Sequence, residues 1–376
     1  MVRIRKFKVL IKPEDIKPSS SKFGVLGVLN PGAARLKNGK IVLYVRVIEK
    51  LKKHEDSKYY YSPRCVGKDK FHMRLDKFKK SLVDGSSNVD FSFKDKTKRL
   101  TYISHLRRVI LDESGFKVLK IDKRPSFYGL KWDAELGVED TRITKIGENY
   151  FMTYVGLTRN ENISTNLAAS NDGLTWFRRG IIFGEQDKDT VLFPEKINEE
   201  YVAYDRPEGN FGFSPPHIWV AYSKDMEYWG KLKGINLSEK HTEFSRSGAG
   251  PPPIKTDKGW LLIFHAITSP KNKGFIFKLK KFFGLKVEPG SEVYAVWAAL
   301  FDLKNPEKLI ARSHHPIMIP RGTKSTSYEG KEVVFPTGMV EDNNGKDILL
   351  FSGSGDIYTT VHKIRKKDIF KTLIFK

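Results

Sequence analysis

The chain has 376 residues, of which 39% are hydrophobic and 12% aromatic, a composition that provides a sizeable core and excludes an intrinsically disordered protein. Its single cysteine, Cys65, excludes an internal disulfide and a cysteine-cluster metal site, which fits a cytoplasmic protein. No stretch approaches the ~20 apolar residues of a membrane span, so the sequence predicts no membrane partner.

The formal net charge of +23 raises the question of a nucleic-acid partner. Lysines and arginines are scattered over the whole length, and the densest groups, at 278–281 and 365–367, stand apart from each other. Neither group belongs to a basic track interleaved with aromatic residues, which is the pattern of single-strand binders. The charge therefore predicts a lysine-rich solvated surface that attracts an anionic substrate such as phosphate, and it disfavours nucleic acid as a partner.

Short β-branched and aromatic runs recur along the chain, and helical periodicity is scarce. Turns such as Asn38-Gly39 and Asn343-Asn344-Gly345 separate them, and these residues tolerate the positive φ of tight hairpins. The pattern predicts an all-β fold. In chain order, the expected strands lie at residues 40–47, 143–146, 150–157, 201–205, 217–223, 260–267, 294–303, 333–340, 347–355 and 358–364.

The expected strands fall into about five repeated cassettes, centred on residues 33–47, 142–176, 193–229, 252–303 and 334–364. In two of them a Ser-x-Asp turn precedes a tryptophan: Asp172 leads to Trp176, and Asp225 leads to Trp229. Such a turn closes a hairpin over an aromatic ring, as in propeller blades. We therefore expect one five-bladed β-propeller domain over residues 1–376. Loop insertions are expected near 49–100 and 267–291, which are rich in Lys, Ser and Gly and show little alternation.

Charged residues at the ends of apolar strands are the candidates for chemistry. A charge in such a place loses solvation unless it has a partner, so several together indicate a shared anion. Taken singly, each residue is equally compatible with a structural ion pair. The candidates are Glu139, Asp140, Arg142, Lys188, Asp189, Arg206, His265 and Asp356.

Several common catalytic motifs are missing from the sequence. It contains no glycine-rich phosphate loop, no pair of histidines at helical zinc spacing and no Gly-x-Ser-x-Gly elbow. This argues against nucleotide, zinc-protease and serine-hydrolase chemistry, and no metal is expected.

Three motifs occur in order along the chain: Gly-Val-Glu-Asp-Thr-Arg at 137–142, Lys-Asp-Thr-Val-Leu-Phe-Pro at 188–194 and Gly-Ala-Gly-Pro-Pro-Pro-Ile at 248–254. Together with segments 30–46, 259–265, 294–303 and 334–356, they resemble glycoside hydrolase family 130, the β-mannoside phosphorylases and related mannosidases. The resemblance extends over nearly the whole chain. It implies a five-bladed propeller whose central funnel holds a mannosyl unit.

The same resemblance implies a role for each matching residue. Asp140 would be the proton donor, acting on the glycosidic oxygen through a hydroxyl of the bound sugar. Thr141 replaces the proline usual in the family, which loosens the turn beside Asp140 but removes no charge. The expected phosphate-holding residues are Lys188, Arg206, Arg246 and His265, with Tyr294 nearby. The expected sugar-binding residues are Asn30, Arg46, Asp189 and Asp356, with Phe335 as a stacking wall.

The function implied is reversible, inverting phosphorolysis of a β-linked mannoside, which releases α-mannose 1-phosphate. Inorganic phosphate is the co-substrate, and no cofactor is expected. Two alternatives stay open: a phosphate-independent β-mannoside hydrolase on the same fold, and a non-catalytic propeller that binds nucleic acid or an anionic polysaccharide. The sequence leaves open the linkage, the acceptor sugar, the direction of reaction in the cell and whether the protein forms a homo-oligomer.

Overall fold

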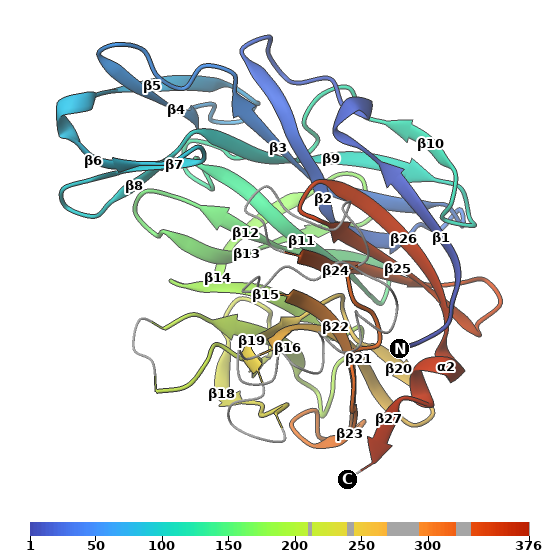
Figure 1. The fold of residues 1–376 in the computed structure, drawn as a ribbon. Coiled ribbons are helices and arrows are strands. Elements are labelled where there is room, and N and C mark those ends of the chain that lie inside the picture. Colours follow the sequence, from blue (N-terminus) through green and yellow to red (C-terminus); the bar gives the residue numbers. More distant parts are fainter. Residues whose placement is uncertain (210–212, 239–243, 269–292, 321–331, 376) are drawn as a thin grey trace.

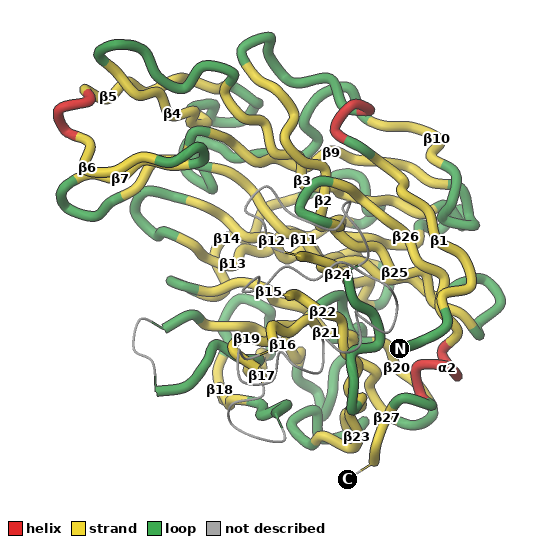
Figure 2. The backbone as a smooth tube through the Cα atoms, in the orientation of Figure 1, coloured by secondary structure: helices red, strands yellow, loops and turns green. Residues whose placement is uncertain are grey.

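The computed structural model describes residues 1–209, 213–238, 244–268, 293–320 and 332–375, and the fold is all-β, as predicted (Figure 1). The backbone tube shows strands throughout, joined mainly by short loops (Figure 2). The one α-helix of the described residues is α2 (Lys366–Phe370), and single 3-10 turns lie at Pro13–Asp15 and Lys80–Leu82. No helix in these ranges is long and apolar enough to cross a membrane.

Three sheets have four antiparallel strands each. The first has the order β10 (Val118–Ile121), β9 (Tyr102–Leu111), β3 (Ile41–Leu51), β2 (Phe23–Arg35). The second runs in sequence order: β11 (Gly137–Ile146), β12 (Asn149–Leu157), β13 (Ile163–Ser170), β14 (Phe177–Phe183). The third does the same: β15 (Asp187–Leu192), β16 (Tyr201–Pro207), β17 (Trp219–Ser223), β18 (Gly230–Gly234).

A larger sheet combines ten strands from both ends of the chain. One part contains β19 (Phe244–Ala249), β20 (Ile254–Thr256), β21 (Gly259–Thr268), β22 (Val293–Phe301), β23 (Leu309–Ser313) and β27 (Leu373–Phe375). The other contains β24 (Glu332–Glu341), β25 (Asp347–Ser354), β26 (Tyr358–Arg365) and β1 (Ile4–Ile11). Among the described residues, two parallel residue pairs between β22 and β24 join the two parts. The first strand of the chain, β1, pairs with β26.

The inner strands of these groups contact one another in series. Strand β2 packs against both β24 and β11, β11 packs against β15, and β15 packs against β19. Strand β21, the neighbour of β19, packs against β24. Apolar side chains fill the spaces between neighbouring sheets, for example where Tyr44 of the first sheet meets Tyr150 and Met152 of the second. Because the apolar core lies between the sheets, the inner strands can carry polar side chains.

The repeated Ser-x-Asp turns are confirmed. Ser170 Oγ accepts the backbone N–H of Gly173, and Asp172 Oδ1 accepts those of Leu174 and Thr175. The second turn repeats these bonds, with Ser223 Oγ and Asp225 Oδ1 as the acceptors.

The segment expected as a loop insertion near 49–100 contains two small sheets that project from one corner of the molecule (Figure 1). They consist of β4 (Tyr59–Cys65) with β5 (Met73–Lys79), and of β6 (Val83–Ser86), β7 (Asp90–Phe93) and β8 (Lys98–Leu100). The other expected insertion, near 267–291, lies outside the described residues from 269 onwards.

Candidate functional site

The residues singled out in the sequence converge on one cavity of about 180 Å³. Nine of the eleven predicted site residues line it: Asn30, Arg46, Asp140, Lys188, Arg206, Arg246, Tyr294, Phe335 and Asp356. Leu29, Ile48 and Val333 complete the wall. The lining contains four cationic side chains and two carboxylates, which leaves a surplus of two positive charges.

Unusual backbone geometry turns several of these side chains toward the cavity. Asn30, Asp140, Asp189 and Asp356 have positive φ angles of 44°, 42°, 61° and 53°. Asn and Asp adopt this region more readily than other residues that carry a Cβ. The first three lie at register shifts in β2, β11 and β15, where a bulge redirects the side chain. Strain of this kind is common at functional sites.

Asp140 has donors and cations on several sides. Asn30 Nδ2 donates to its Oδ1 at 2.8 Å, and Arg46 Nη1 lies 3.0 Å from the same oxygen. Burial raises the pKa of Asp140, but the charges of Arg46 and Arg142 and the Asn30 hydrogen bond outweigh burial, so this pKa lies below its ordinary value.

The adjacent carboxyl of Glu139 is shifted in the opposite direction. Its Oε1 pairs with Arg46 Nη2 and accepts a hydrogen bond from Ser104 Oγ at 3.3 Å. Burial raises the pKa of Glu139, the charge of Arg46 opposes this rise, and the charge of Asp140 adds to it. Glu139 is therefore the weaker acid of two carboxyl groups that both contact Arg46.

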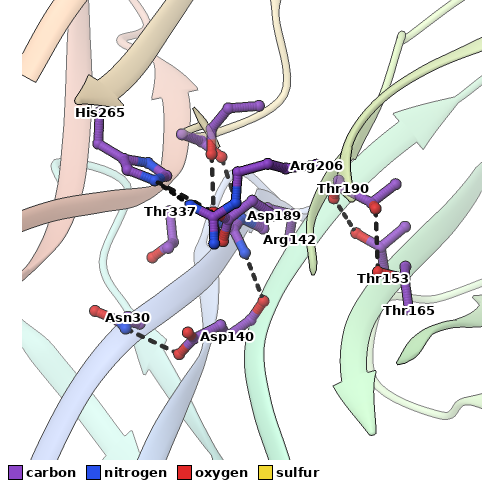
Figure 3. A network of polar contacts seen from close by, with 12 residues as sticks. Asn30, Asp140, Arg142, Thr153, Thr165, Asp189, Thr190, Arg206, His265 and Thr337 are labelled. Atoms are coloured by element: carbon purple, nitrogen blue, oxygen red, sulfur yellow. Dashed lines mark hydrogen bonds and ion pairs between the residues drawn. The ribbon is translucent and has the colours of Figure 1, made fainter. Parts of the chain in front are cut away.

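Asp189 and His265 lie behind the cavity and are not among its lining residues. Asp189 lies between two arginines: Oδ1 is 3.1 Å from Arg142 Nη2 and Oδ2 is 2.9 Å from Arg206 Nη1 (Figure 3). His265 Nε2 lies 3.2 Å from Asp189 Oδ2. Burial raises the pKa of Asp189, but its three cationic or hydrogen-bonding neighbours hold it well below the ordinary value.

His265 is fully buried, and burial lowers its pKa to about 4 although Asp189 opposes the shift. It is therefore neutral at neutral pH, when its Nε2–H can donate to Asp189. The sequence predicted that His265 holds phosphate and that Asp189 binds sugar, and both roles stay predictions. Neither residue lines the cavity, and both contact Arg206, because a buried carboxylate needs cations and donors around it. Gly248 makes room for this cluster, since a Cβ there would lie 2.6 Å from Asp189 Oδ2 and 2.7 Å from His265 Nε2.

Arg142 connects this cluster to Asp140. Its Nη1 donates to the Asp140 carbonyl at 3.0 Å, and its Nε donates to the Gly250 carbonyl at 3.2 Å. Its guanidinium also lies 5.7 Å from the centre of the Phe335 ring. The Phe335 ring also contacts that of His265, with 4.2 Å between ring centres and a tilt of 39° between the ring planes. The proposed stacking wall is thus fixed by an arginine and a histidine.

Three of the four cationic side chains that line the cavity come from three different strands. Lys188 of β15 is paired in register with Arg206 of β16, and Arg246 lies on β19. Arg206 Nη2 pairs with Glu208 Oε1, and Arg246 Nη2 lies 3.5 Å from Glu208 Oε2. The sequence analysis missed Glu208. Its position two residues after Arg206 was the available signal, since alternate residues of a strand share a face.

A second carboxyl pair, Asp187 and Asp205, lies on the same two strands and is buried. Asp187 Oδ1 accepts hydrogen bonds from Thr165 Oγ1 at 2.6 Å and Thr190 Oγ1 at 3.0 Å. Thr165 and Thr190 lie side by side next to the charged cluster (Figure 3). Burial raises the pKa of Asp205 to about 6 and that of Asp187 well above its usual value, and the charge of Asp205 adds to the rise at Asp187. Two raised pKa values in one buried pair indicate that the pair retains a shared proton.

Comparison with known proteins places these residues in a family. The family model described as β-1,4-mannooligosaccharide phosphorylase, glycoside hydrolase family 130, matches residues 108–374. The β-1,2-mannobiose phosphorylase of Listeria innocua is 30% identical over 362 residues, which cover 92% of this chain and 91% of that protein. A 1,2-β-oligomannan phosphorylase of Thermoanaerobacter is 34% identical over 274 residues, or 71% of this chain and 81% of that one. A solved structure of the Listeria innocua protein in complex with β-1,2-mannobiose superposes with a TM-score of 0.80 at 26% identity, covering 96% of each chain.

Proposed function

Because the chain belongs to glycoside hydrolase family 130, we propose that it is a glycoside phosphorylase that cleaves a β-linked mannoside with inorganic phosphate. The observation that carries this proposal is the cavity wall: Lys188, Arg206 and Arg246 share it with Asp140. Three cationic side chains on one cavity suit an anion such as phosphate. A hydrolase needs a carboxylate base to activate water, whereas phosphate is already a nucleophile and needs only to be held in position.

In this reaction a phosphate oxygen attacks the anomeric carbon of the mannosyl unit as the bond to the glycosidic oxygen breaks. The leaving oxygen takes the bond electrons and receives a proton that originates from Asp140, relayed by a sugar hydroxyl. Attack opposite the leaving group inverts the configuration and gives α-mannose 1-phosphate. In the reverse direction, the acceptor hydroxyl gives its proton to the same sugar hydroxyl, which passes its own proton to the Asp140 carboxylate.

Phosphate also helps Asp140 to act as an acid. Arg46, Arg142 and Asn30 hold the pKa of Asp140 below its ordinary value against the effect of burial. A phosphate dianion bound to Lys188, Arg206 and Arg246 adds negative charge near Asp140, which favours its protonated form. Phosphate thus supplies the nucleophile and raises the proton affinity of the acid in one binding step.

For the linkage we propose β-1,2. The family model carries a β-1,4 description, but the two relatives at 30% and 34% identity are both named for β-1,2-mannosides. One of these matches extends over nearly the whole of both chains. The substrate we infer is therefore β-1,2-mannobiose or a longer β-1,2-mannoside.

For the architecture we propose a single five-bladed propeller over residues 1–376. The weak β22–β24 junction divides the ten-stranded sheet into two blades, which together with the three four-stranded sheets makes five. The serial contacts of β2, β11, β15, β19 and β24 support a closed ring around the cavity. Strand β1 completes the last blade by pairing with β26.

The test is to incubate the purified protein with α-mannose 1-phosphate and a panel of acceptors, including mannose and β-1,2-mannobiose, and to measure phosphate release. We expect release only with an acceptor that yields a β-1,2-mannoside. Hydrolysis of β-mannosides at an unchanged rate without phosphate would instead establish the hydrolase. No turnover in either assay, with salt-dependent retention on DNA, would favour the non-catalytic binding protein.

A further inference from the structure

Glu208 contacts two cations of the cavity wall without lining the cavity itself. It is the first residue after β16, and its backbone N–H donates to the Gln186 carbonyl at 2.8 Å. Its two carboxylate oxygens have different partners: Oε1 pairs with Arg206 Nη2, and Oε2 lies 3.5 Å from Arg246 Nη2. One carboxylate therefore bridges guanidinium groups from two sheets.

The two arginines need such a bridge because like charges on one small cavity repel each other. Arg206 is held from both sides, by Asp189 at Nη1 and by Glu208 at Nη2, and its side chain is only 2% exposed. Arg246 is different. Its side chain is 34% exposed, so solvent and side-chain entropy compete with its interaction with Glu208.

We propose that Glu208 is a positioning residue that holds Arg206 and Arg246 as one pair, spaced to bind two oxygens of the same phosphate. This inference rests on the proposed phosphorolysis. Glu208 contacts both arginines and is not among the residues that line the cavity, so it acts on phosphate through the arginines. Its negative charge holds the two guanidinium groups in position, so that the arrangement that binds phosphate is preorganised before phosphate binds.

The prediction is specific to phosphate. In the variant Glu208→Gln, we expect the KM for phosphate to rise about 10-fold, the effect of losing one charge-assisted contact. The KM for the mannoside should stay within about twofold, because Asn30, Arg46 and Phe335 are not bound to Glu208. The inhibition constant of sulfate, an unreactive anion of similar shape, should rise by the same factor as the KM for phosphate. If Glu208 only stabilised the fold, its replacement would raise the KM for phosphate and the KM for the mannoside together.

A double-mutant cycle tests the bridge itself. In the Arg246→Ala background, Glu208→Gln should raise the KM for phosphate by a clearly smaller factor than in the wild type. Glu195→Gln is the matched control, since Glu195 pairs with Lys255 at the surface and neither residue lines the cavity. This control should leave both KM values unchanged.

Two results would overturn the inference. One is an unchanged or lowered KM for phosphate in Glu208→Gln, since a lowered value would mean that the carboxylate competes with phosphate. The other is an undiminished effect in the Arg246→Ala background. Phosphate-independent turnover by the wild type would instead refute the proposed function, so the two failures can be told apart.

Discussion

The buried carboxyl pair of Asp187 and Asp205 leads to a quantitative prediction about stability. Burial raises the pKa of Asp205 from 3.8 to about 6. The folded protein therefore retains a proton that the unfolded chain has lost, and the associated stability is present below about pH 4 and lost as the pH rises through about 6. A shift of about two pKa units corresponds to about 3 kcal/mol. Asp205→Asn cannot ionise, and its amide can donate to Asp187. Relative to the wild type it should therefore gain up to about 3 kcal/mol across this range.

Thermal unfolding followed by circular dichroism between pH 4 and pH 8 would measure this gain. At an unfolding entropy of about 2.1 cal/mol/K per residue, 376 residues give about 0.8 kcal/mol/K, so the Tm difference should grow by about 4 °C. Asp69→Asn, at an exposed position, is the control and should show no such growth. A difference between Asp205→Asn and wild type that is constant across the range, or that shrinks with rising pH, would refute the shared proton.

Three further predictions concern the site. Asp140→Asn should lower kcat for unactivated mannosides by at least about 100-fold with an unchanged Tm, and near-normal turnover would remove Asp140 from the acid role. Arg206→Ala should raise the KM for phosphate by about 100-fold or more, because Asp189 and Glu208 also lose a cationic partner. Initial rates measured at varied phosphate concentration would test this, and an unchanged KM would place Arg206 outside the phosphate site. Gly248→Ala should lower both Tm and activity, since its Cβ would clash with Asp189 and His265, and wild-type values in both assays would contradict the packing described.

The sequence predicted the all-β class and most of the cavity wall because its motifs lie on the inner strands. Asp140 and Lys188 belong to short polar runs bounded by apolar strands, so their positions were readable locally. Glu208 was missed because one of its partners, Arg246, lies on another sheet, and pairing between sheets leaves no trace in local periodicity. The phosphate-holding role of His265 came from the family resemblance and stays a prediction; the apolar strand around it does not reveal which side of the strand faces the cavity, and the structure leaves His265 outside the lining.

The inserted sheets were also missed as strands, for a different reason. Strands β5 and β6 are exposed or half-buried along their whole length, and the alternation of apolar residues in β5 is limited to Met73 and Leu75, too short a pattern to mark a strand. Their hydrogen bonds come from hairpin pairing, as between Tyr59 and Lys79. Aromatic contacts such as Tyr60 with Phe91, 5.1 Å between ring centres, provide what core they have.

The pairing of β1 with β26 has a consequence for how the protein is made. Ile4 pairs with Ile364, so β1 cannot form this pairing until residue 364, which is 360 positions further along the chain, has been synthesised. Until then β1 is an unpaired edge, the kind of segment that recruits strands from other molecules. Four basic residues, Arg3, Arg5, Lys6 and Lys8, give this unpaired edge a positive charge, which disfavours pairing with strands of other molecules. The sheet that carries Phe335 is thus completed only after β26 has been synthesised, and the cavity that Phe335 lines is completed with it.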